Sequence, residues 1–174
     1  MKRLFFLIPI VIFLGLAGLL FIGLFQGPPS LLPSPLVGKP APDIALPALD
    51  AQASNFTRAE LGQGKPIIIN FWASWCVPCR LEHSTLEALA KRNGVTLYGV
   101  DYKDEPEKAR AFLSELGNPF GKINQDKDGR VAIDWGVTGV PETFVVDSAG
   151  VIRMHYAGPL TDEVLDRLVL PALK

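Results

Sequence analysis

The strongest constraint on the fold is the run PIIINFWA, residues 66–73, which stands just before the only two cysteines of the chain. This run is apolar and rich in β-branched residues, which is typical of a strand buried on both faces of a parallel sheet. Cys76 and Cys79 follow in the segment SWCVPC, with C-x-x-C spacing. Because functional sites of such sheets lie at the carboxyl ends of the parallel strands, the strand brings both cysteines to that edge.

Helical and strand patterns alternate along the rest of the chain. Prolines 78 and 106 suit the first turns of helices, and the segment Ser148-Ala149-Gly150 is a turn signal between two strands. We predict a short edge strand over 43–49, helices over 77–92 and 105–116, a strand over 95–102, a turn-rich loop over 121–130, an antiparallel hairpin with strands 142–147 and 151–157, and a last helix from Thr161 to Leu168 before Pro171. This order predicts an α/β fold with a central mixed β-sheet and helices on both faces.

The N-terminus carries an uncharged run from Leu4 to Phe25, about 22 residues, which is long enough to cross a bilayer as a helix. A cleaved signal peptide is the alternative, but its apolar region is shorter and ends at a small-x-small site that this segment lacks. Lys2 and Arg3 precede the run, so the positive-inside rule keeps the N-terminus in the cytoplasm. We therefore predict a single-pass anchor in the inner (cytoplasmic) membrane, with the catalytic domain in the periplasm.

Composition supports three segments and excludes one class of partner. Residues 26–36 are rich in proline, glycine and serine, which is typical of a semi-rigid tether. We therefore divide the chain into a cytoplasmic tip and transmembrane helix over 1–25, the tether over 26–36, and one domain over 37–174. The net charge is −1 and no basic stripe is present, so nucleic acid is not expected as a partner.

The C-x-x-C spacing is compatible with several kinds of site. Haem attachment needs histidine directly after the second cysteine, and Arg80 stands there instead. A structural zinc site needs four ligands, and this counts against zinc because the whole chain has only two cysteines and two histidines, His83 and His155. A periplasmic metal carrier that uses His83 and a carboxylate stays open as an alternative. A peroxiredoxin has threonine or serine three residues before its reactive cysteine, a position that Ala73 fills here.

A dithiol redox centre gives each position a role. Cys76 stands at the start of a predicted helix, where free backbone N–H groups and the helix dipole lower the pKa of a thiol. We therefore predict Cys76 as the nucleophile. Cys79 returns to nearly the same helix face and is predicted to resolve the mixed disulfide. A disulfide that closes two intervening residues constrains little of the unfolded chain, so a purely structural bridge is not expected.

Glu82 shares a helical stripe with Cys79, Leu86 and Leu89. Burial on that face would raise the pKa of its carboxyl group, and we predict that Glu82 relays the proton that Cys79 must lose. The alternative is a carboxylate that tilts out to solvent near the helix start. Trp75 is predicted either to shield Cys76 and contact the substrate or simply to pack in the core.

The segments FWASWCVPCR and GVTGVPETFVVD resemble the thioredoxin superfamily, and specifically the membrane-anchored DsbE/CcmG family of cytochrome c maturation. The resemblance covers nearly the whole chain. It includes LVGKPAP, DYKDEPEKARAFLSELGNPF and YAGPL, which are more selective than the W-C-x-x-C element alone.

This resemblance implies a thioredoxin-like fold and further site residues. Pro141 becomes the cis-proline that faces the cysteines, Val140 the residue whose backbone pairs with an extended substrate, and Glu142 a neighbour that makes the site acidic. Asn70 stands where ordinary thioredoxins carry a buried aspartate, so the proton relay must come from elsewhere, which strengthens the case for Glu82. Trp75, Val140, Pro141 and Glu142 are therefore the expected substrate-binding residues.

The resemblance also implies a thiol:disulfide oxidoreductase that works as a periplasmic reductant. Its substrates would be apocytochrome c or a haem-ligation (CcmH-type) protein, and its electrons would come from a DsbD/CcdA-type membrane protein. No cofactor beyond the redox-active disulfide, no metal and no oligomer are expected. A general extracytoplasmic disulfide reductase is the alternative with the same chemistry.

Overall fold

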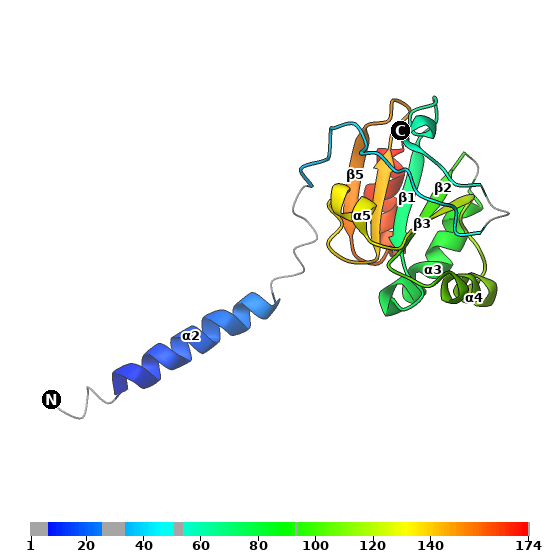
Figure 1. Cartoon of the computed structure of the whole chain (residues 1–174). Helices are drawn as coiled ribbons and strands as arrows, with labels where there is room; N and C mark the ends of the chain where they lie inside the picture. Colours follow the sequence, from blue (N-terminus) through cyan, green and yellow to red (C-terminus); the bar gives the residue numbers. More distant parts are fainter. Residues whose placement is uncertain (1–6, 26–33, 51–53, 93, 174) are drawn as a thin grey trace. The chain divides into compact units, whose positions relative to one another are not determined.

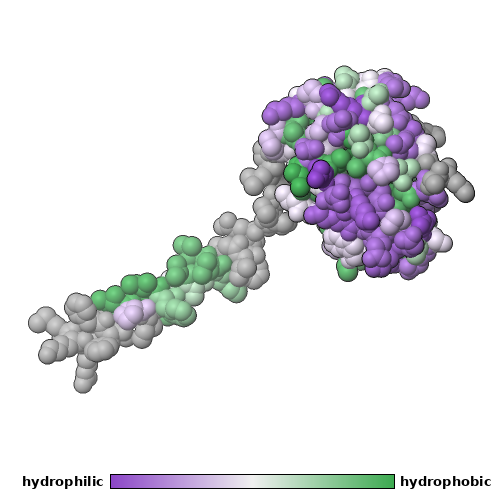
Figure 2. Space-filling view, in the orientation of Figure 1, coloured by the Kyte–Doolittle hydropathy of each residue, from purple (hydrophilic) through white to green (hydrophobic). Residues whose placement is uncertain are grey.

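The computed structural model describes residues 7–25, 34–50, 54–92 and 94–173 (Figure 1). These fall into two units, one within residues 1–32 and the other within 33–174. The first unit contains helix α2 (Leu7–Phe25), whose described surface is largely hydrophobic (Figure 2). None of the described helices has both the length and the apolar character needed to cross a membrane.

Parts of the predicted N-terminal segments lie outside the described residues. The predicted anchor begins in residues 1–6, and the predicted tether lies mostly in residues 26–33. Residues 34–36, the end of that tether, are described and form a turn in which the Val37 N–H donates to the Ser34 carbonyl oxygen. The side chain of Leu36 packs against the core of the second unit. Ordered packing thus starts slightly before residue 37.

The second unit is built on a five-stranded mixed sheet with the order β3-β2-β1-β4-β5. Its strands are β1 (Ile67–Trp72), β2 (Leu97–Tyr102), β3 (Lys122–Asp126), β4 (Glu142–Val146) and β5 (Ile152–Ala157). The first three strands run parallel, whereas β4 is antiparallel to β1 and to β5. β1 is central and all six of its residues are buried, as its continuous apolar run predicts.

Helices cover both faces of the sheet, which confirms the predicted layers (Figure 1). One face packs against α3 (Val77–Ala90), α4 (Pro106–Leu116) and a C-terminal run of α6 (Asp162–Val164), η3 (Leu165–Val169) and α7 (Leu170–Ala172). The other face packs against α5 (Arg130–Asp134) and the segment that precedes β1, which includes the short helix η2 (Arg58–Glu60).

A hydrophobic core lies on each face of the sheet, and successive side chains of β1 point alternately into one core and the other. Ile68 and Trp72 pack toward α3 and α4, whereas Ile69 and Phe71 pack toward α5. Asn70 lies between Ile68 and Trp72 in this alternation, so its side chain points to the same face as α3. β1 therefore ends at Trp72 with one polar side chain beneath the helix that carries the cysteines.

The prediction of a loop over residues 121–130 is wrong. This stretch forms the edge strand β3, a turn and the start of α5. Its Asn and Asp residues disfavour strands in general, but here their side chains satisfy backbone groups of neighbouring segments. Asn124 exchanges hydrogen bonds with the backbone of Phe56, and Asp126 accepts from the N–H of Ala132.

Two smaller predictions also need correction. Residues 43–49 form no regular strand; Ala48 makes a single bridge to Asn124 because the neighbouring prolines cannot donate to a ladder. The last helix does not stop before Pro171 but continues to Ala172. It widens into a π-type segment over Leu165–Val169, and this wider turn precedes the proline, which has no N–H to donate.

Candidate functional site

Cys76 and Cys79 form a disulfide at the N-terminus of α3. Cys76 is the N-cap residue, and its Sγ accepts a hydrogen bond from the N–H of Cys79 at 3.1 Å. Pro78 occupies the first helical turn, where its missing N–H would have no intrahelical partner. After reduction, the same N–H and the helix dipole would stabilise negative charge on Cys76, which favours Cys76 over Cys79 as the attacking thiolate.

The loop before β4 faces this disulfide. The Val140 carbonyl oxygen lies 3.4 Å from the Cys76 Sγ, and the Val140–Pro141 peptide bond is cis, as the resemblance implied. The Pro141 carbonyl oxygen accepts from the N–H of Gly158 on the other side. The structure therefore brings Val140 and Pro141 to the cysteines from a part of the chain more than 60 residues away.

Glu82 is buried on the inner face of α3, with 1% of its surface exposed. Its Oε1 accepts from the Asn70 side chain at 3.0 Å, and its Oε2 accepts from the Leu160 N–H at 2.7 Å. Burial raises the pKa of Glu82 from 4.5 to about 7, although these two hydrogen bonds oppose the rise. The alternative in which Glu82 tilts out to solvent is therefore wrong, and the carboxyl group can change charge near neutral pH.

Glu142 is also buried, with 1% exposure, and lies beneath the cis-proline loop. Its Oε1 accepts from the Thr138 N–H, the Thr138 hydroxyl and the Gly139 N–H, and its Oε2 lies 2.5 Å from the His155 Nε2. Burial alone would raise the pKa of Glu142, but the hydrogen bonds from His155, Thr138 and Gly139 lower it below its ordinary value. The carboxylate thus fastens the loop from inside rather than from the surface, and substrate contact by Glu142 stays a prediction.

Replacing Glu142 with alanine should lower the free energy of unfolding by about 2–4 kcal/mol at pH 7, because three donors of the loop and His155 lose a buried charged acceptor. Urea denaturation of the full chain measures this. The pKa of Glu142 is lowered by folding, so its contribution is present above its ordinary pKa of 4.5 and is lost as pH falls through the lower folded value. The difference between the two proteins should therefore shrink in acid.

Glu142→Gln provides the matched control. Its amide oxygen can still accept from the loop, so it should cost about 1 kcal/mol and show little dependence on pH. An alanine variant as stable as the unmodified protein would show that the loop does not depend on Glu142.

Trp75 lies at the surface with 56% exposure, so the alternative of core packing is wrong for this residue. Its indole Nε1 donates to the Lys103 carbonyl oxygen at 3.1 Å, and its ring lies 6.5 Å from that of Tyr102. The segment after β2 therefore holds Trp75 beside Cys76. Trp135, by contrast, is fully buried in the core on the α5 side of the sheet.

His83 is buried between α3 and α4. Its Nε2 lies 3.0 Å from the Gly117 carbonyl oxygen, and its ring meets Phe112 edge to face. In the described part of the chain, no group of three or more His, Cys, Asp or Glu side chains is placed to hold a metal ion. The Nε2 nitrogen of His83 thus contacts a backbone carbonyl oxygen.

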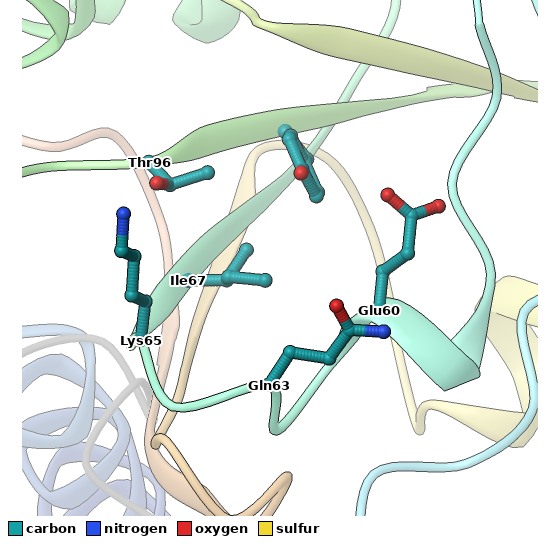
Figure 3. A pocket seen from close by; sticks show the side chains of 6 residues that line it. Glu60, Gln63, Lys65, Ile67 and Thr96 are labelled. Carbon is teal, nitrogen blue, oxygen red and sulfur yellow. The ribbon is translucent and has the colours of Figure 1, made fainter.

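A hollow of about 300 Å³ lies near the start of β1 (Figure 3). Its lining residues are Glu60, Gln63, Lys65, Ile67, Thr96 and Tyr98. β1 begins at this hollow and ends near Cys76, so the hollow lies at the far end of the strand from the disulfide.

Several residues that shape the site are not among the site residues predicted from the sequence. Thr138 and His155 fix Glu142, the Leu160 N–H fixes Glu82, and Asp104 binds the backbone before Cys76. Thr138 and Leu160 lie in the segments GVTGVPETFVVD and YAGPL, on which the family resemblance rests. Those segments were a signal for these residues, but the partner of each depends on the folded arrangement.

Comparison with known proteins supports the same chemistry. Residues 36–168 match the Redoxin family. The thiol:disulfide interchange protein HelX of Rhodobacter capsulatus is 45% identical over 172 residues, which cover 99% of this chain and 96% of HelX. The thiol:disulfide interchange protein DsbE of Escherichia coli K12 is 41% identical over 175 residues, which cover 98% of this chain and 94% of DsbE.

Solved structures share the fold. A secreted Mycobacterium tuberculosis disulfide oxidoreductase, described as homologous to E. coli DsbE, superposes with a TM-score of 0.58 at 25% identity, covering 70% of this chain and 96% of that one. The matches to HelX and DsbE extend along nearly the whole chain, and the C-x-x-C pair stands at the N-terminus of a helix opposite a cis-proline. The chain therefore belongs to the DsbE/CcmG family of thioredoxin-like thiol:disulfide oxidoreductases.

Proposed function

We propose that this protein is the reductant of a cytochrome c maturation pathway. In this role Cys76 attacks a disulfide in the C-x-x-C-H segment of apocytochrome c or in a haem-ligation (CcmH-type) protein, and Cys79 then releases the reduced product. The observation that carries the proposal is the full-length similarity to DsbE proteins together with a thiol pair whose first sulfur accepts a backbone N–H.

The site geometry supports an extended peptide as the substrate. The Val140 backbone borders the Cys76 sulfur, and the exposed ring of Trp75 lies on the segment that leads to that sulfur. An extended chain that carries a cysteine can pair with the backbone at Val140 while its side chain reaches Cys76. We propose that Trp75, Val140 and Pro141 contact this substrate.

We further propose that residues 1–25 anchor the protein in the inner membrane with the domain in the periplasm. Support comes from the uncharged run over residues 4–25 and the two cations that precede it. A reductant in an oxidising compartment is oxidised at every turnover, so it needs electrons from across the membrane. A DsbD/CcdA-type membrane protein that transfers thiol electrons is the proposed donor.

A trapping experiment tests this function. Cys79→Ser in the full chain should accumulate mixed disulfides at Cys76, because the resolving thiol is absent. Non-reducing purification from cells that make cytochrome c, followed by mass spectrometry, should recover apocytochrome c or a haem-ligation protein, together with a multi-span membrane donor. The double variant Cys76→Ser, Cys79→Ser is the control and should recover none of these.

Other outcomes would contradict the proposal. A broad set of unrelated secreted proteins would indicate a general disulfide reductase with the same chemistry. A reduction potential near that of DsbA, about −120 mV, would overturn the direction of electron flow.

A further inference from the structure

Two aspartates at the end of β2 lie under the segment that leads into Cys76. Asp101 belongs to β2 and is opposite Trp72 of β1, and Asp104 follows three residues later. Asp101 is fully buried and Asp104 is 6% exposed. Buried carboxyl groups are costly unless they are neutral or well bonded, and neither aspartate is needed for the exchange steps described above.

Asp104 holds the backbone just before the disulfide. Its Oδ2 accepts from the Ser74 N–H at 2.5 Å, and its Oδ1 accepts from the Glu105 N–H at 2.8 Å. The neighbouring Lys103 has a left-handed backbone with φ of 48°, and its carbonyl oxygen accepts from the indole of Trp75. The turn after β2 thus fastens two consecutive residues, Ser74 and Trp75, immediately before Cys76.

Asp101 is bonded far less completely than Asp104. Its Oδ2 lies 3.5 Å from the Gln125 amide nitrogen, and its Oδ1 has no hydrogen-bond partner among the described residues. Burial raises the pKa of Asp101 to about 8, and the charge of Asp104 raises it further, whereas the hydrogen bond from Gln125 lowers it. At neutral pH Asp101 therefore keeps its proton.

Among the groups around Asp101, Asp104 is the charged group that raises its pKa. β1 contributes the neutral indole of Trp72, and β3 contributes the neutral amide of Gln125. Two lysines close to Asp104 in the sequence make other contacts. The Lys103 Nζ lies 5.1 Å from the centre of the Tyr102 ring, and the Lys108 Nζ lies 3.2 Å from Glu105.

We propose that Asp101 and Asp104 are a pair of positioning residues that hold the Ser74–Trp75 segment in place for exchange at Cys76. While Asp101 is neutral, Asp104 is free to accept from Ser74. When Asp101 loses its proton, a second negative charge appears in the buried site near Asp104, and the added repulsion weakens the bond from Asp104 to Ser74. This inference depends on disulfide exchange at Cys76 but not on the cytochrome substrate, so a failure of one proposal would leave the other untouched.

The first test is the amide resonance of Ser74 in the full-length oxidised protein, measured by ¹H–¹⁵N NMR between pH 6 and pH 10. The cysteines are disulfide-bonded in this form and do not titrate. We expect the Ser74 resonance to move with a midpoint near pH 8. In Asp101→Asn, which mimics the neutral carboxyl group, that step should disappear, whereas any step due to Glu82 should remain. Asp134→Asn, an exposed change on α5, should behave as the unmodified protein.

The second test is the rate at which dithiothreitol reduces the Cys76–Cys79 disulfide. The ratio of the Asp101→Asn rate to the unmodified rate cancels the ionisation of dithiothreitol itself. We expect this ratio to be flat below pH 7 and to rise roughly two- to fivefold above pH 9, the size expected for one added negative charge near the reacting sulfurs. A purely structural role would change the ratio equally at every pH.

Clear outcomes would overturn the inference. The inference is wrong if the Ser74 resonance does not move between pH 6 and pH 10. It is also wrong if the change near pH 8 persists in Asp101→Asn. If Asp101→Asn does not fold, Asp104→Asn replaces it: the charge that raises the pKa of Asp101 is removed, so the midpoint at Ser74 should fall below that of the unmodified protein. An unchanged midpoint there would also contradict the pair.

Discussion

Replacing Cys76 with serine is expected to abolish thiol:disulfide exchange, whereas replacing Cys79 is expected to stop only the second step. The Cys79 N–H donates to the Cys76 sulfur at the helix N-terminus, so Cys76 gains the stabilisation that a reactive thiolate needs. Both cysteines are nearly buried, at 4% and 2% exposure, so the N-cap position of Cys76 rather than its exposure favours it as the nucleophile. Stopped-flow reduction of a C-x-x-C-H peptide disulfide measures both steps.

The two variants distinguish attack from resolution. Cys76→Ser should give no reaction above the buffer rate. Cys79→Ser should form one equivalent of mixed disulfide with the peptide and then stop. If Cys76→Ser formed the mixed disulfide instead, Cys79 would be the nucleophile, and the assignment of roles would be reversed.

Much of the fold is predictable because local signals agree with the tertiary structure. The apolar run 66–73 could only be a buried strand next to a helix that starts at the cysteines, and Pro106 and Gly117 frame α4 at both ends. In strand β3 the local signals and the tertiary structure disagree. Its polar residues are explained by bonds to Phe56, which lies 68 residues away along the chain, and to Ala132 in the next helix, α5.

The same division applies to the site. The spacing of Cys79 and Glu82 on one helix is local, and both are buried on α3, with Cys76 at its N-cap. Val140 and Pro141 could be placed only through family resemblance, because a cis bond and a contact across more than 60 residues leave no local pattern. The roles of Asp101 and Asp104 could not be predicted from the sequence, because they depend on burial and on contacts that form only in the folded chain.

Glu82→Gln is expected to slow resolution of the mixed disulfide by about 10²-fold at pH 8, the lower end of what a positioned acid or base contributes. Burial raises the pKa of Glu82 to about 7, so the carboxylate that can accept the Cys79 proton is populated above that pH. In the unmodified protein the resolution rate should rise between pH 6 and pH 8 with a midpoint near 7. The glutamine variant should lack this rise and accelerate only where Cys79 ionises unaided. Single-turnover kinetics from a preformed mixed disulfide isolate this step.

A stability measurement shows whether the expected titration belongs to Glu82. Folding raises its pKa from 4.5 to about 7, so its contribution to stability is complete below about pH 4.5 and is lost as pH rises to about 7. Glu82→Gln should remove that part of the decline, whereas Glu87→Gln, a change of the same kind at a partly exposed position of α3 that pairs with Lys91, should not. If Glu82→Gln flattens stability but resolves the mixed disulfide at the unmodified rate across pH, Glu82 is a buried acid that titrates without serving as the relay. Cys79 would then have to pass its proton directly to solvent.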